Sequence, residues 1–181
     1  SKKEFILSKF YTVIIFALVS TIFVFIVSMI LGLIYSDYNE IPIIFADLEY
    51  LFAFFIKLIA FFSFGLLMGI LVKRSAFAVG AILVWFFAES FFKGFLFWKF
   101  KDADHTSDRV NEFTQFLPLE SIANLIKEPF SRLNAVQSVA KQVGEDFKFD
   151  YDVHWYQIAI VLIWTCIFIY SSYYILKKRD L

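Results

Sequence analysis

Four long apolar stretches leave this chain little freedom in how it can fold. Each reaches the roughly 20 residues that a helix needs to cross the hydrocarbon core of a bilayer. A helix that is apolar all round has no face for water, and a lone strand would leave backbone groups unpaired in lipid. The sequence therefore predicts an all-α, polytopic membrane protein with one transmembrane domain over residues 1–181 and spans at about residues 11–35, 50–72, 75–98 and 155–176.

Composition agrees with this class of protein. Of the 181 residues, 60% are hydrophobic and 22% aromatic, whereas soluble domains are nearer half apolar with fewer aromatics. Basic and acidic residues both number 17, so net charge gives no reason to expect a nucleic-acid partner. The single cysteine, Cys166, excludes an internal disulfide; it lies in the last apolar stretch, where we expect a small buried side chain.

Basic residues near the spans predict the orientation. They gather before the first span, between the second and third, and after the fourth, whereas the loop between the first two spans carries only acidic charges. Short loops rich in Lys and Arg stay in the cytoplasm. We therefore expect both termini and the turn between the second and third spans to be cytoplasmic; the basic residues are Lys2, Lys3, Lys9, Lys73, Arg74, Lys177, Lys178 and Arg179.

The segment 99–154 is polar and is expected to lie outside the cytoplasm. Within it, Phe116 to Phe130 carries apolar residues at helical spacing between two prolines, which predicts a short amphipathic helix on the outer surface. A second helix is expected, on a weaker pattern, at about 132–143. The apolar residues of the first helix are Leu119, Ile122, Leu125 and Ile126.

Three charged residues fall inside the predicted spans: Lys57, Glu89 and Lys93. Lys57 and Glu89 are about equally far from the turn between their spans, roughly 23–25 Å at 1.5 Å per residue, so they can form an ion pair. Lys93 competes for Glu89 because the two are four residues apart on one helix, or it extends to the outer surface. Either these charges line a polar transport path, or they form a structural contact between helices.

Small residues occur on both sides of the same turn. Gly65 and Gly69 form a GxxxG pattern, and Ala76 and Gly80 a second pair with the same spacing. Such pairs allow membrane helices to approach closely. We expect them to pack the two spans against each other; assembly with another subunit is the alternative.

Sequence motifs for catalysis are missing. The chain has no GxxxxGK[ST] phosphate loop, GxSxG, HExxH or CxxC, and His105 and His154 have no metal-ligand spacing. We therefore expect no catalytic residue, metal or cofactor in the chain itself.

Four segments resemble parts of a known family, in the right order and on consistent sides. They are SKKEFILSKF (Ser1 to Phe10), LVKRSAFAVG (Leu71 to Gly80), FLPLESIANLIKEP (Phe116 to Pro129) and ILKKRDL (Ile175 to Leu181). Together they resemble the cytoplasmic element, the basic turn, the external Leu-Pro segment and the basic terminus of the C-terminal part of an ABC transporter permease of the type-2 export class.

This resemblance carries its own expectations. Such permeases have about six spans, so the chain is expected to be a fragment of a longer permease. Two permease copies in the bacterial inner membrane work with cytoplasmic ABC ATPase subunits, which bind ATP and Mg²⁺. The resemblance implies that the ATPase docks on Ser1, Lys2, Lys3, Glu4 and Phe5, and on the turn at Lys73 and Arg74.

Two other functions are compatible with four membrane helices. The chain is then either a scaffold or assembly subunit that transports nothing, or a small ion channel with Lys57 and Glu89 in its pore. Only a permease of an ATP-driven exporter requires a stoichiometric ATPase partner.

Overall fold

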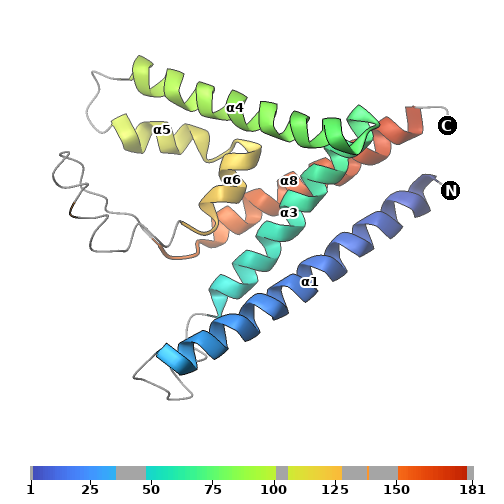
Figure 1. Cartoon of the computed structure of the whole chain (residues 1–181). Coiled ribbons are helices and arrows are strands. Elements are labelled where there is room, and N and C mark those ends of the chain that lie inside the picture. Colours follow the sequence, from blue (N-terminus) through green and yellow to red (C-terminus); the bar gives the residue numbers. More distant parts are fainter. Residues whose placement is uncertain (1, 36–47, 101–105, 128–137, 139–150, 179–181) are drawn as a thin grey trace.

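A computed structural model describes residues 2–35, 48–100, 106–127, 138 and 151–178, and every regular element among them is a helix. Four of these helices are long and apolar enough to cross a membrane, which confirms the predicted fold class (Figure 1). They are α1 (Lys2–Tyr35), α3 (Glu49–Val72), α4 (Ser75–Lys99) and α8 (Trp155–Lys178).

The membrane helices match the predicted spans closely at most of their ends. The main difference is at the start of α1, which begins at Lys2 rather than at Tyr11. The lysine-rich segment expected before the first span is therefore a continuous part of the helix. At 1.5 Å per residue, the 34 residues of α1 extend about 51 Å, well beyond a hydrocarbon core of roughly 30 Å.

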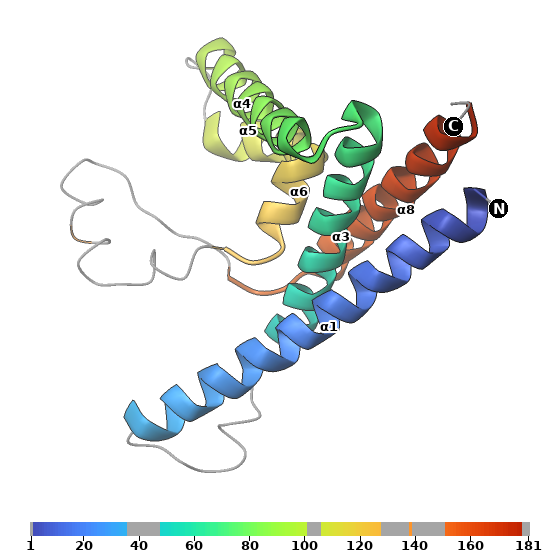
Figure 2. The same ribbon diagram turned by 45° about the vertical axis from the view of Figure 1, so that its right-hand side comes forward.

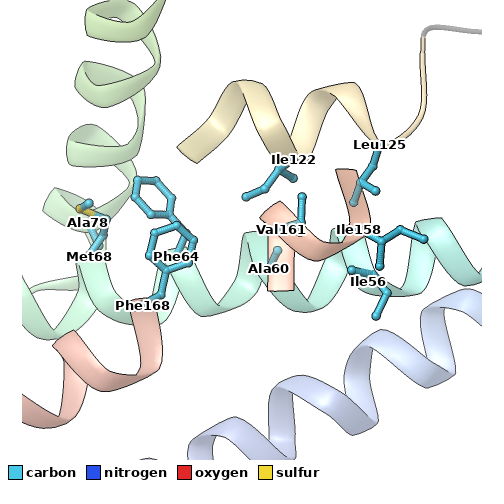
Figure 3. Close-up of a cluster of buried hydrophobic side chains, with 10 residues drawn as sticks. All are labelled: Ile56, Ala60, Phe64, Met68, Ala78, Ile122, Leu125, Ile158, Val161 and Phe168. Atoms are coloured by element: carbon cyan, nitrogen blue, oxygen red, sulfur yellow. The ribbon is translucent and has the colours of Figure 1, made fainter. Parts of the chain in front are cut away.

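Helix α3 lies at the centre of the bundle and contacts α1, α4, α6 and α8. One face of α3 presents a buried side chain at every fourth position, and these side chains pack on α4, α6 and α8 (Figure 3). Residues four apart lie on one face of a helix, so this stripe forms the core; its members are Ile56, Ala60, Phe64 and Met68. The ring of Phe64 contacts Phe168 of α8, with 5.2 Å between centroids.

The turn between α3 and α4 is tight and has one unusual backbone conformation. Lys73 ends α3 in the left-handed region, with φ 65°, and its N–H donates to the carbonyl of Gly69 at 3.1 Å. Many helices end with a residue in this left-handed conformation, and that residue is usually glycine. From this turn α4 diverges from α3 (Figures 1 and 2). Most of the side chains of α4 are exposed.

Two short helices, α5 (Thr106–Thr114) and α6 (Pro118–Asn124), follow α4. Helix α6 begins at Pro118 as predicted and ends before Pro129. Helix α5 was not predicted from the sequence. Its Val110 and Thr114, four residues apart, are both fully buried. The helix expected at 132–143 lies, except for Ser138, outside the described residues.

Helix α6 packs into the bundle, which its amphipathic pattern alone did not indicate. It packs between the membrane helices, and its Ile122, with Leu125 just after it, joins the core formed by α3 and α8 (Figure 3). The indole N–H of Trp164 on α8 also donates to the carbonyl of Phe116, before α6, at 2.9 Å. The apolar face of α6 therefore faces the bundle instead of the membrane surface.

Cys166 also differs from expectation, since its side chain is exposed. Cys166 lies outside the packed core of the bundle. Its neighbours Thr165 and Phe168 face the bundle instead.

Candidate functional site

The charged residues of the membrane helices meet at α6. Glu89 and Lys93 come from α4, Lys57 comes from α3, and Glu120 belongs to α6 itself. We call these four residues the α6 clamp. Lys57 and Glu89 lie roughly 21–24 Å along their helices from the Lys73 turn, at 1.5 Å per residue. The clamp is therefore located within the apolar helices α3 and α4, not at their ends.

Glu89 binds the N-terminus of α6. Its two carboxylate oxygens accept hydrogen bonds from the N–H of Leu119, both at 3.1 Å, and one accepts from the N–H of Glu120 at 3.0 Å. The first N–H groups of a helix have no partner within the helix, and α6 has no side-chain cap of its own at Leu117. The carboxylate of Glu89 supplies that cap from another helix.

Two further groups complete the α4 side of the clamp. The indole N–H of Trp85, one turn before Glu89, donates to the same carboxylate at 2.6 Å. Lys93, one turn after Glu89, forms an ion pair with Glu120 of α6. The two side chains of this pair are 31% and 22% exposed, so solvent screens it only in part.

Lys57 binds the opposite end of α6. Its amine donates to the carbonyls of Ala123 at 3.2 Å and Ile126 at 3.4 Å. The last carbonyls of a helix are unpaired and carry partial negative charge. A carboxylate at the N-terminus and an ammonium at the C-terminus both match the dipole of α6, so the clamp stabilises this short helix from two sides.

A cavity of about 450 Å³ lies between α3, α4 and α6 beside the clamp. Its walls are mostly apolar, with Phe61 and Phe86 on opposite helices and Ile122 from α6. Lys57, Glu89 and Glu120 also line it, and each has a hydrogen-bond partner or an ion-pair partner in the protein. The cavity is within the range typical of small-molecule sites.

The clamp differs from the pairing expected from spacing along the chain. Spacing allowed Lys57 to pair with Glu89, with Lys93 as the competing partner; the structure gives both Lys57 and Glu89 partners on the α6 segment. Lys93 likewise binds Glu120 instead of Glu89 or the outer surface. Sequence reasoning missed Trp85 and Glu120, although Pro118 at the first helical position and Glu120 two residues later are typical of a helix start.

The small residues near the turn do not bring α3 and α4 close together. A Cβ added at Gly65, Gly69 or Gly80 would meet no atom within 4 Å in the described part of the chain, and Ala76 is exposed. The helices already diverge at this point, and Ala78 is the α4 residue that joins the core. Assembly with another subunit through these residues stays a prediction.

The basic ends of the helices share one side of the molecule. The start of α1, the turn between α3 and α4, and the end of α8 lie together in both views (Figures 1 and 2). Lys73, Arg74 and Phe5 are exposed there, whereas Lys2 is half-buried. Ser1 lies outside the described residues. The residues expected to dock an ATPase, from Lys2 to Phe5 and at the turn, therefore face the same side.

Comparison with known families identifies the chain. A family model described as an ABC-2 family transporter protein matches residues 1–181. The chain belongs to the ABC-2 transporter family. The ABC-2 permease is a membrane component of a transporter, and the family implies an ABC ATPase partner. The described part of this permease has the multi-pass helical architecture that such a role requires. Comparison with curated proteins and with solved structures gave no match.

Proposed function

We propose that the chain is a permease subunit of an ATP-driven exporter. Its spans form part of the substrate path, and a separate cytoplasmic ATPase binds ATP and Mg²⁺ and supplies the energy. Membership of the ABC-2 family supports this proposal. The missing phosphate loop supports it as well, because a permease of this kind needs a partner for ATP hydrolysis.

The orientation in this proposal follows from charge. The basic start of α1, the Lys73–Arg74 turn and the end of α8 face the cytoplasm of a bacterial inner membrane, and α6 lies toward the outside. The positive-inside rule favours this arrangement, and the positions of these three segments on one side of the molecule agree with it.

The observation that carries the proposal is the continuity of α1. Its first turn holds the expected docking residues Lys2 to Phe5, and the same helix then crosses the membrane without a break. In the membrane it packs on α3, with Phe16 against Phe62 at 5.3 Å between ring centroids and Ala17 fully buried. A displacement of the start of α1 is therefore transmitted to α3 through one continuous helix.

We place the outer closure of the path at α6. Helix α3 holds the C-terminal end of α6 through Lys57, and α4 holds its N-terminal end through Glu89. When α1 and α3 move together, α3 and α4 can no longer both keep their present contacts with α6. ATP-driven motion thus opens or closes the outer end of a path formed with a second permease copy.

Purification with the ATPase tests the proposal. We expect an ABC ATPase gene beside that of the permease, and we expect the full-length permease co-expressed with this ATPase to purify as a stoichiometric complex with vanadate-sensitive ATP hydrolysis. In proteoliposomes, screened substrates that stimulate hydrolysis are expected to be transported only with ATP. A permease that purifies without an ATPase contradicts the proposal and favours a scaffold; ion conduction in a bilayer without ATP favours a channel.

A further inference from the structure

A second cavity lies far from the α6 clamp, between the start of α1 and the end of α8. Its volume is about 410 Å³, and it is a groove formed by the first turns of α1 and the last turns of α8. Lys3 and Leu7 line it from α1, and Cys166, Ile169 and Tyr173 line it from α8.

The groove is polar at one end and apolar at the other. Lys3 and Tyr173 are nearest to the ends of their helices, whereas Leu7, Ile169 and Cys166 lie one to two turns farther into the bundle. One turn corresponds to about 5.4 Å along a helix. The groove therefore runs from the ends of the two helices toward the middle of the bundle, and its chemistry changes in the same direction.

The charge at the polar end is positive. Lys3 is the one charged residue among the described residues that line the groove. Lys177 and Lys178 lie in the last turn of α8, at the same side of the molecule (Figures 1 and 2). Lys178 sits over the ring of Tyr174 at 4.5 Å, and Tyr174 stacks at 6.5 Å on Tyr170, which lines the groove.

We propose that this groove binds an anionic phospholipid from the leaflet at this end of the bundle. The phosphate lies at Lys3, with the hydroxyl of Tyr173 as a further donor, and an acyl chain lies against Leu7, Ile169 and Cys166. Basic pockets between membrane helices favour anionic headgroups, and the apolar part of the groove favours a lipid over a free phosphate ion.

Lipid retention by the full-length permease tests this site. The protein is reconstituted in nanodiscs of phosphatidylcholine, with or without phosphatidylglycerol, extracted in detergent and weighed by native mass spectrometry. We expect retained phosphatidylglycerol, and about fivefold less of it in Lys3→Gln, which is the change expected for about 1 kcal/mol per basic residue. Lys3→Arg keeps the charge and is expected to retain the lipid.

Lys9→Gln is the matched control, because Lys9 is on the same helix but outside the groove. Equal retention by Lys3→Gln and the wild type, or an equal loss in Lys3→Gln and Lys9→Gln, overturns the proposal. The measurement uses neither the ATPase nor a substrate, so its result does not depend on the proposed function.

Cys166 locates the bound lipid. Its exposed thiol lies in the apolar part of the groove, so an acyl chain there should slow its modification by N-ethylmaleimide. We expect slower labelling at Cys166, mapped by peptide mass spectrometry, when phosphatidylglycerol is present, and a loss of this difference in Lys3→Gln but not in Lys9→Gln. If the labelling rate of Cys166 in the wild type is the same with and without phosphatidylglycerol, the lipid does not bind in this groove and the proposal is wrong.

Discussion

Glu89 shows how one residue can hold a separate segment of a membrane protein in place. Its carboxylate accepts from two backbone N–H groups of α6 and from the indole of Trp85. Hydrogen bonds to a charged acceptor are stronger than those between neutral groups. A carboxylate at membrane depth is costly without partners, so these bonds both accommodate Glu89 and fix α6.

The first prediction concerns this cap. Glu89→Gln removes the charge, and an amide accepts less strongly from the N–H groups of α6; we expect α6 to lose about 1–2 kcal/mol of local stability. Amide hydrogen exchange at residues 119–124 should become about tenfold faster, with the other helices unchanged. Glu112→Gln, an exposed carboxylate on α5, is the control. Equal exchange in both variants would refute the role of Glu89.

The second prediction concerns Lys73, whose backbone is left-handed. A left-handed residue other than glycine costs roughly 1–2 kcal/mol, so Lys73→Gly should stabilise the turn by about 1 kcal/mol and raise the melting temperature measured by tryptophan fluorescence in detergent. Arg74 has an extended backbone, with φ −132°, and Arg74→Gly should bring no such gain. A melting temperature for Lys73→Gly at or below that of Arg74→Gly contradicts the argument.

At the residue scale, the sequence identified the members of the clamp better than its contacts. Lys57, Glu89 and Lys93 stood out because charges in an apolar span are rare. Their partners on the α6 segment were not predictable from spacing along two helices, because that segment lies far along the chain and, for Lys57 and Glu89, the partners are backbone groups; only Lys93 has a side-chain partner there, Glu120. Backbone groups leave no signature in the sequence.

At the scale of elements, α3 connects most of the others. Its stripe of buried residues faces α4, α6 and α8, and Ala53 and Ile59 of α3 are buried as well. In a membrane, where lipid is as apolar as the core, such packing contributes through close contact more than through exclusion of water. A substitution in this stripe should therefore weaken several helix pairs at once.

The third prediction tests the stripe. Phe64 is 1% exposed and its ring contacts Trp85 and Phe168. Phe64→Ala leaves a cavity and should cost about 3 kcal/mol, measured as a lower midpoint of unfolding in an SDS titration. Phe52→Ala, on the same helix but 48% exposed, should have little effect. Similar midpoints for the two variants would mean that α3 does not hold the core.

The fourth prediction tests α1 as the coupling element. Replacing Ser8 and Lys9 together by glycine destabilises α1 between its proposed docking residues and its contacts with α3, since each glycine costs a helix about 1 kcal/mol. We expect ATP hydrolysis by the complex to continue while transport per ATP falls. The same positions replaced by alanine keep the helix and should keep coupling. Unchanged transport in the glycine variant would exclude α1 as the coupling element.

Elements differed in how well the sequence predicted them. The membrane helices were clear, because a long apolar stretch has one structural solution in lipid. The packing of α6 into the bundle was not predicted, because its amphipathic pattern fits a membrane surface and a bundle equally well. Packing in the bundle is favoured because side chains of α3 and α4 cap both ends of α6. These contacts satisfy backbone groups of the short helix that would otherwise be unpaired among the spans.

At the scale of the whole molecule, the fifth prediction is orientation. With Cys166 replaced by Ser and any cysteines outside this region removed from the full-length protein, single cysteines at Arg74 and at Glu112 lie on opposite sides of the proposed membrane. A membrane-impermeant thiol reagent added to intact spheroplasts should label the cysteine at Glu112 and spare the one at Arg74 until the cells are lysed. The reverse pattern would invert the orientation and remove the docking residues from the ATPase.

The capping of α6 also bears on the order in which the protein is assembled. Helices as short as its seven residues are unstable alone in water, and the groups that hold its two ends belong to α3 and α4. Both of these helices leave the ribosome before α6 does. Because synthesis starts at the N-terminus, α3 and α4 are made before α6, which can then form against them. Helix α8 is made last and covers Ile122 and Leu125 of the α6 segment. In a rearranged gene that encodes α6 before α3 and α4, α6 would be made before the helices that hold it. The segment would then be exposed to proteases until α3 and α4 are inserted.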